Sequence, residues 1–352
     1  MSEVGAALFT GLVDLASRGL GGEVLAASDD FFASKDNLVE PAAAVFVPGK
    51  YTERGKWMDG WESRRRRTPG HDWAILRLGT PGVVKGLDID TSHFLGNHPP
   101  YASVEAVAAE PDTPVEALQQ LPWTEILDQV PLMAGRQNMF TVSHQASWAK
   151  SWTHLRLNIF PDGGVARLRA YGTVDPDWND DDVDEEASEH LQEHEQDLVA
   201  VRSGGLALAC SDSFFGPMNN LLLPGRAENM GGGWETRRRR GPGFDWIVLK
   251  LGARGTIGMI EVDTNHFKGN CPDRCSIEGM YSPQAKLTEL VDPEAAWRGV
   301  LEMTPLQPHQ RHFFRDEITH RGPFTHIRLS IYPDGGISRL RIYGRRSVAP
   351  VD

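Results

Sequence analysis

Residues 154–172 read HLRLNIFPDGGVARLRAYG, and residues 326–344 read HIRLSIYPDGGISRLRIYG. In the first copy Leu155, Leu157 and Ile159 alternate with polar residues, which is the two-residue period of a strand with one buried face. The Pro-Asp-Gly-Gly that follows is typical of a tight turn, and alternation resumes after it. The pattern predicts two antiparallel strands joined as a hairpin, once in each copy.

Other segments repeat in the same order. The copies are 183 residues apart at the first motif and 173 apart at the next two, so the first copy holds ten extra residues within 48–59 (PGKYTERGKWMD). The repeated pairs are SDDFF (28–32) with SDSFF (211–215), GWESRRRRTPGHDW (60–73) with GWETRRRRGPGFDW (233–246), and DTSHFLGNHP (90–99) with DTNHFKGNCP (263–272).

The repeats indicate an internal duplication in which both copies have one fold. Strand-length apolar runs and turn residues dominate each copy, so we expect an all-β chain with two antiparallel β-sandwiches in tandem. The expected boundaries are an N-terminal segment 1–21, a first repeat 22–174, an acidic linker 175–200, a second repeat 201–346 and a C-terminal tail 347–352.

The net charge of −12 has one source. Twelve Asp and Glu residues and no Lys or Arg lie between positions 175 and 197, so the rest of the chain is neutral. Such a block predicts a solvated, partly disordered linker, and the alternative is a segment that binds arginines or a partner. Without a net positive field a nucleic acid is a poor partner.

Composition also argues against a membrane protein and a disulfide-rich protein. No stretch reaches the roughly 18 apolar residues of a membrane helix, so we expect no membrane partner. The three cysteines form no even disulfide framework, which favours a reduced, cytoplasmic location.

The most prominent chemical feature of the sequence is a run of four arginines in each copy, at Arg64–Arg67 and 237–240. Guanidinium groups hold carboxylates through two parallel bonds, so the runs predict a small anionic ligand. Because alternate residues of an extended segment face opposite sides, either Arg64 and Arg66 or Arg65 and Arg67 would face it, with Arg237 and Arg239 as counterparts in the second copy. The alternative is a structural cluster in which carboxylates such as Glu62 or Asp72 neutralise the run.

The motif after the arginines supplies proton-transfer candidates. His93 and His266 follow Asp-Thr where a strand enters a Gly-Asn turn, and a histidine there can act as acid or base; a purely structural histidine is the alternative. Gly96 is expected to take a positive backbone angle in this turn, and Asn97 and Asn270 could offer their amides to a ligand.

Glu62, the acid nearest the first arginine run, is a candidate base. Together with Asp90 and His93 it is compatible with a divalent metal, but no closely spaced ligand pair requires one. We therefore expect no metal site and no required cofactor.

In combination, the W-E-[ST]-R-R-x-R-x-P-G-x-D-W and D-T-x-H-F-x-G-N-x-P motifs, in two copies, resemble the allantoicase family. The resemblance implies a jelly-roll, galactose-binding-like sandwich in each half and a homo-oligomer. It also implies allantoate amidinohydrolase activity (EC 3.5.3.4), in which allantoate and water give ureidoglycolate and urea during purine breakdown. The copies differ where His71 of the first is replaced by Phe244, so they are not equivalent if His71 reacts.

The resemblance lets roles be assigned. The arginines would hold the carboxylate of allantoate, and Asn97 a ureido oxygen, while Glu62, His71 and His93 would move protons. The first copy is favoured because it keeps His71 and has the extra loop at 48–59, which could close over substrate. The alternatives are a non-enzymatic module that binds a small carboxylate or sugar acid, and a hydrolase of a related ureido acid such as ureidoglycolate.

Overall fold

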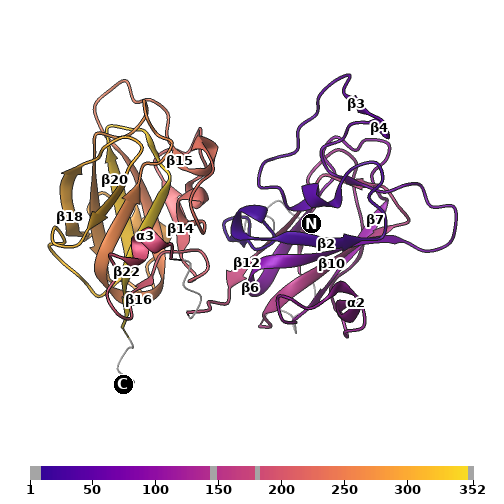
Figure 1. Ribbon diagram of the computed structural model, residues 1–352, viewed down its shortest axis with the longest axis horizontal. Helices are drawn as coiled ribbons and strands as arrows, with labels where there is room; N and C mark the ends of the chain where they lie inside the picture. Colours follow the sequence, from indigo (N-terminus) through magenta and orange to yellow (C-terminus); the bar gives the residue numbers. More distant parts are fainter. Residues whose placement is uncertain (1–8, 143–148, 179–182, 348–352) are drawn as a thin grey trace. The chain divides into compact units, whose positions relative to one another are not determined.

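A computed structural model describes residues 9–142, 149–178 and 183–347. The chain divides into two compact units, Met1–Asp175 and Pro176–Asp352 (Figure 1). Three of the linker acids, residues 180–182, lie outside the described residues, as do residues 1–8 of the predicted N-terminal segment and 348–352 of the predicted tail. Within the described ranges, no helix is long and apolar enough to cross a membrane.

Strands dominate both units, which confirms the all-β class. Those of the first unit's main sheet are β1 (Val13–Asp14), β2 (Glu23–Ala27), β6 (Asp72–Asp90), β7 (Tyr101–Val107), β8 (Thr124–Pro131), β9 (Met139–Thr141), β10 (Trp152–Phe160) and β12 (Arg167–Val174). Those of the second are β13 (Gln196–Asp197), β14 (Leu206–Cys210), β16 (Asp245–Asp263), β17 (Arg274–Met280), β18 (Arg298–Pro305), β19 (Arg311–Phe314), β20 (Phe324–Tyr332) and β22 (Arg339–Arg346). All described pairings are antiparallel.

One long strand organises each unit. The beginning of β6 pairs with β2 and β10, and its end pairs with β9 and β12. The strand therefore takes part in both layers of the sandwich, changing partners near Gly82. In the second unit β16 does the same with β14, β20, β19 and β22.

The hairpin predicted for 154–172 is wrong. β10 and β12 are both strands, but each pairs with β6, and β6 lies between them in the sheet order. The turn at residues 161–164 carries the chain from one layer to the other. Alternation specifies strands and their buried faces, whereas the choice of partner depends on β6, about 70 residues upstream.

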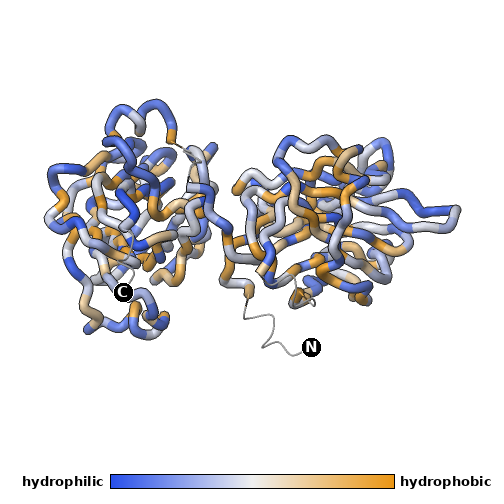
Figure 2. The backbone as a smooth tube through the Cα atoms, turned by 90° about the horizontal axis from the view of Figure 1, so that it is seen from below, coloured by the Kyte–Doolittle hydropathy of each residue, from blue (hydrophilic) through white to orange (hydrophobic). Residues whose placement is uncertain are grey.

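Short two-stranded sheets lie beside the main ones. β5 (Trp61–Glu62) pairs with β11 (Gly164–Val165), and β15 (Trp234–Glu235) pairs with β21 (Gly336–Ile337). Trp61 and Trp234 are fully buried, and their indole N–H groups donate to the carbonyls of Asp29 and Asp212 at 2.8 and 2.9 Å. These tryptophans tie the start of each arginine run to the core. Figure 2 shows hydrophobic residues alternating with hydrophilic ones along the chain of both units.

The insertion in the first copy forms a hairpin of its own. β3 (Tyr51–Thr52) pairs with β4 (Gly55–Lys56), and the hairpin projects from one end of the first unit (Figure 1). Arg54 donates to the Phe31 carbonyl at 3.1 Å and its guanidinium lies over the Phe31 ring. The hairpin is thus fixed to the motif that precedes the arginine run.

Much of the expected linker packs on the second unit. Gln196 and Asp197 form β13, which pairs with β22, and the short helix α3 (Glu185–Ser188) covers Tyr343 and Met259 through Ala187. Likewise Val13–Asp14, placed by the sequence in an N-terminal segment, pairs with β12. Counting charges does not predict the packing of the linker, because single apolar residues anchor an otherwise acidic segment to the second unit.

Candidate functional site

The turn at residues 161–164 brings the repeated motifs of the first unit together. The Asp72 amide donates to the Pro161 carbonyl at 3.0 Å, and the Ser63 amide donates to the Gly163 carbonyl at 3.1 Å. The Gly164 amide in turn donates to the Asn97 carbonyl at 2.8 Å. The arginine run, the residues after it and the Asn97 loop therefore meet at one end of the sandwich.

Glycine is required at position 163 for the contact between this turn and the Asn97 loop. Its φ is +143°, and a Cβ there would lie 2.7 Å from the Asn97 carbonyl oxygen and from the Pro99 nitrogen. A side chain would push the Asn97 loop away from the turn, because atoms this close cannot be accommodated without a backbone shift.

Two of the four arginines in the first run are neutralised by carboxylates. Arg64 reaches Asp29 Oδ2 at 2.6 Å, and Arg66 Nη1 donates to the buried Asp72 at 2.8 Å. The Arg64 bonds outweigh the effect of burial and lower the pKa of the Asp29 carboxyl. This half of the run is structural.

The other two are available to a ligand. Arg65 and Arg67 are exposed and take part in no hydrogen bond or ion pair with any part of the chain that the structure describes. The backbone amide of Arg66, between them, donates to Asp162 at 2.9 Å, so the backbone that carries them is fixed. The alternation expected from the sequence is present: Arg64 and Arg66 have carboxylate partners, and Arg65 and Arg67 have none within the described residues.

Glu62 lies on β5, just before the arginine run in the chain. Burial raises the pKa of its carboxyl above the usual value, while a hydrogen bond from Asn97 and the charge of Lys56 act in the opposite direction. Asn97 Nδ2 donates to Glu62 Oε1 at 2.7 Å. A half-buried carboxylate with one fixed donor and a raised pKa can accept a proton.

His93 has an unusual backbone. Its φ is +71°, a conformation costly for a residue with a side chain, whereas Gly96 is not among the positive-φ glycines, contrary to expectation. The His93 ring has Nε2 3.1 Å from the Ala44 carbonyl and stacks on Phe46. A strained, exposed histidine is a mark of a functional position.

His71 is held differently. Its ring lies 4.6 Å from that of Phe160, centroid to centroid, one residue before the organising turn. In the second unit Phe244 lies 5.0 Å from Tyr332 in the same way. The replacement therefore preserves the packing and removes the titratable group.

The second unit otherwise reproduces the site. Arg237 pairs with Asp212, Arg239 pairs with Asp245, and Asn270 donates to Glu235. The strained φ recurs at His266 (+72°), with Nε2 2.9 Å from the Ala227 carbonyl. In this unit Arg238 and Arg240 are the exposed pair.

The sequence of the two repeats also matches a known protein family. The allantoicase repeat model matches residues 13–175 and 196–347. The chain belongs to the allantoicase family. It is 48% identical to probable allantoicase 1 of Burkholderia mallei over 94% of both chains, and 46% identical to the probable allantoicase of Pseudomonas fluorescens SBW25 over 97% of this chain and 98% of the relative.

The solved structures agree. The crystal structure of an allantoicase from Saccharomyces cerevisiae is 33% identical, with a TM-score of 0.81 over 98% of each chain. The jelly-roll duplication that the resemblance implied is thereby confirmed for this allantoicase-family chain.

Sequence reasoning missed two parts of the allantoicase-family site. Asp29 and Asp212 are the partners of the first arginine in each run, and their signal was present in the repeated Ser-Asp motif. Lys56 and Phe46 reach the first site from the insertion and the segment before it: the Lys56 ammonium lies 4.5 Å from the centre of the Phe46 ring, which stacks on His93. Because neither belongs to a repeat, no pattern marked them.

The described residues of this allantoicase-family chain include no group of three or more His, Cys, Asp or Glu side chains that could hold a metal ion. Asp90, considered as a ligand, accepts from the Ser92 amide at 2.7 Å. The expectation that no cofactor is required stays a prediction.

Proposed function

We propose that this chain is an allantoicase whose first unit hydrolyses allantoate to ureidoglycolate and urea. Membership in the family supports the enzyme class, and one observation supports the site: Arg65 and Arg67 are exposed, have no partner within the described residues, and follow the half-buried Glu62 by three and five positions. Arginine forks match a carboxylate, and the glutamate supplies the base that hydrolysis needs.

The reaction requires a nucleophile and a proton donor. The central carbon of allantoate carries the carboxylate, one hydrogen and two ureido groups. Water replaces one ureido group there: the bond from the carbon to one ureido nitrogen breaks, and a bond from the carbon to the water oxygen forms. Glu62 would accept a proton from the water, and the departing nitrogen needs a proton to leave as urea. His71 and His93 are the candidate donors.

Asn97 would have a second part besides binding a ureido oxygen. Its Nδ2 donates one hydrogen bond to Glu62, which would position the base and favour its ionised form, and the second N–H of Nδ2 would serve the ligand. Lys56 is a cation whose charge acts on Glu62. The second unit lacks the hairpin and His71, which favours the first unit for chemistry.

Urea release from allantoate by the purified chain tests the reaction, with allantoin and ureidoglycolate as parallel substrates. We expect urea from allantoate and accumulation of ureidoglycolate. Urea from ureidoglycolate alone would keep the arginine site and change the specificity. If none of the three releases urea, with or without added manganese, the enzyme proposal fails. The homo-oligomer and the cytoplasmic location stay predictions that rest on the family.

A further inference from the structure

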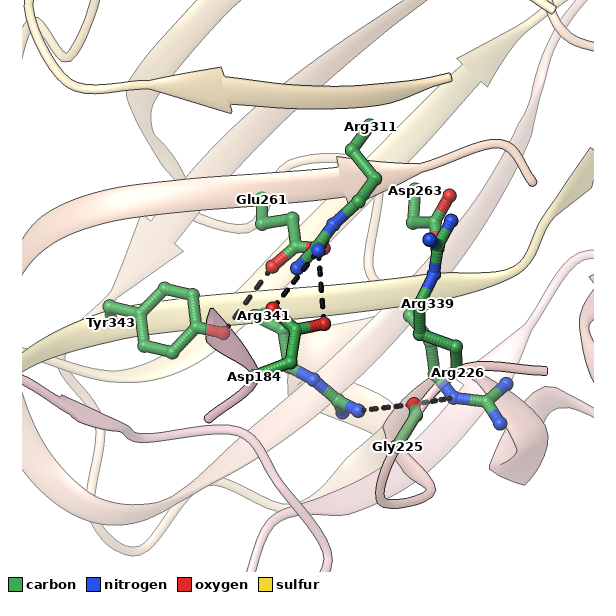
Figure 3. A pocket seen from close by; sticks show the side chains of 9 residues that line it. All are labelled: Asp184, Gly225, Arg226, Glu261, Asp263, Arg311, Arg339, Arg341 and Tyr343. Carbon is green, nitrogen blue, oxygen red and sulfur yellow. Dashed lines mark hydrogen bonds and ion pairs between the residues drawn. The ribbon is translucent and has the colours of Figure 1, made fainter. Parts of the chain in front are cut away.

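Arginines gather at two places in the second unit, a pocket next to the acidic segment and the run at 237–240. In the pocket, Arg311 donates to Glu261 at 2.7 Å and to Asp184 and Glu186 at 2.9 and 2.8 Å, as Figure 3 shows for Glu261 and Asp184. Three carboxylates hold this guanidinium group, so its charge serves to attach the acidic segment to the unit.

The arginine run differs from the pocket because half of its charge has no counter-ion. Carboxylates neutralise Arg237 and Arg239. Arg238 and Arg240 are exposed and take part in no hydrogen bond or ion pair with any residue that the structure describes. The backbone amide of Arg239 donates to Asp334 at 2.8 Å, so the segment that carries the pair is fixed. Two nearby guanidinium groups on a fixed backbone suit a carboxylate.

The second unit also keeps the features of the first site that are costly to the fold. The φ of His266 is +72°, as that of His93 is +71°. Each ring has Nε2 near a loop carbonyl, 2.9 Å from Ala227 and 3.1 Å from Ala44. A strained backbone and adjacent like charges both destabilise a folded unit. Their presence in both copies therefore favours a functional role for the second copy as well.

The two copies differ in groups that serve the reaction proposed for the first unit. Phe244 replaces His71, and the second copy lacks the ten extra residues that form the hairpin with Lys56. The second unit thus keeps the arginines that would hold a carboxylate, and it lacks one candidate proton donor and one cation.

The amide of Asn270 indicates which carboxylates would fit. In the first unit Asn97 Nδ2 donates to Glu62, and its second N–H has no acceptor among the described residues. In the second unit Asn270 Nδ2 donates to Glu235 and also to Met230 Sδ, at 3.3 Å from the sulfur. Because an amide nitrogen carries two N–H groups, neither remains for the oxygen of a ureido group.

We propose that the arginine run of the second unit is a separate binding site for small carboxylates, in which Arg238 and Arg240 hold the carboxylate and a ureido group is not selected for. Glycolate, a small carboxylate without a ureido group, should bind there as well as hydantoate (N-carbamoylglycine) does. The binding does not depend on the reaction proposed for the first unit.

Calorimetric titration of the full chain tests the proposal. The parent carries Arg65→Gln and Arg67→Gln, so that the first site does not contribute. We expect glycolate and hydantoate to bind this parent with dissociation constants within about threefold of each other, since neither gains a further hydrogen bond. Glycolamide, which has the same shape as glycolate but no charge, should not bind.

A double variant locates the site. Arg238→Gln with Arg240→Gln, added to the parent, should weaken glycolate binding at least about tenfold, because the carboxylate loses its charge-assisted contacts. The matched control is Arg274→Gln with Arg298→Gln, two exposed arginines on β17 and β18. It changes the net charge by the same amount and should bind glycolate like the parent.

Met230→Ala tests the specificity of the site. The substitution removes the sulfur acceptor and frees one N–H of Asn270, so hydantoate should then bind several-fold more tightly than glycolate. An unchanged ratio of the two affinities would overturn the part assigned to Asn270.

Three outcomes would overturn the site itself: no glycolate binding to the parent, equal glycolate affinity in the parent and in the Arg238 and Arg240 double variant, or equal weakening by the control pair. Because the parent already lacks the first-site arginines and the readout is binding, failure here is distinct from failure of urea release by the unaltered chain.

Discussion

In each arginine run, carboxylates neutralise the first and third arginines. Arg64 and Arg66 have carboxylate partners, and Arg65 and Arg67 have none in the part of the chain that the structure describes. Sequence alternation predicted that two of four would act together, but it could not say which two. That choice depends on Asp29, which is 35 residues upstream and reaches the run only in the folded unit.

Replacing Arg65 and Arg67 by Gln should lower kcat/KM for allantoate by about tenfold or more for each arginine, mainly through KM, because each loses a charge-assisted contact to the carboxylate. Steady-state urea release at varied allantoate concentration measures kcat/KM and KM. The matched control is Arg238→Gln with Arg240→Gln in the second unit. A larger loss in that pair would contradict the placement of the reaction in the first unit.

Asn97→Ala should move the acidic limb of the kcat/KM profile to higher pH. Glu62 must be ionised to act as base, so activity falls as pH falls through its pKa. Loss of the Asn97 donor raises that pKa further. Asn270→Ala, which removes the equivalent bond to Glu235, is the control. An unchanged acidic limb in Asn97→Ala would mean that Glu62 is not the base.

At the scale of elements, the hairpin β3–β4 distinguishes the two sites. It brings Lys56 over the ring of Phe46, which stacks on His93. Its existence could be inferred from the shift in repeat spacing, but its position over Phe31 could not, because that rests on the Arg54 contacts. The predicted 154–172 hairpin failed for a similar reason, since strand partners are chosen by the long central strand.

Lys56→Gln should raise KM for allantoate several-fold with a smaller change in kcat, because it removes a cation near the carboxylate site. Lys50→Gln is the matched control in the same hairpin, where the ammonium lies over Trp57 instead. Equal kinetics for the two variants would show that the hairpin contributes no charge to substrate binding.

At the scale of the whole molecule, the internal duplication was the sequence feature that predicted most of the fold. Four repeated motifs in the same order predicted two like units, and the structure has them. What repetition could not show is the consequence of the places where the copies differ, such as His71 and its counterpart Phe244.

The units should also differ in the pH dependence of stability. Burial, with the charge of Asp90 next, raises the pKa of Asp88 in the first unit to about 7, and its Oδ2 has no partner. The folded unit holds that proton more tightly than the unfolded chain. Stability from this group is therefore present below about pH 4, is lost between about pH 4 and 7, and stays constant above.

Asp88→Asn should accordingly stabilise the chain at pH 8 by up to a few kcal/mol, at about 1.4 kcal/mol for each pKa unit, and by less at pH 5. Its counterpart Glu261 binds Arg311 and the Tyr343 hydroxyl, so Glu261→Gln should destabilise. Denaturant unfolding at the two pH values measures both. Destabilisation by Asp88→Asn at pH 8 would contradict the argument.

The pairing of alternate arginines also sets the range over which each site attracts its ligand. Half of the run's charge is already cancelled within the unit, and the chain as a whole carries −12. In physiological salt, fields are screened within about 8 Å. Long-range electrostatic steering would therefore do little to guide an approaching anion, which would interact with Arg65 and Arg67 only at contact. We expect association at an ordinary diffusive rate, with selectivity set by the dissociation rate of the ligand.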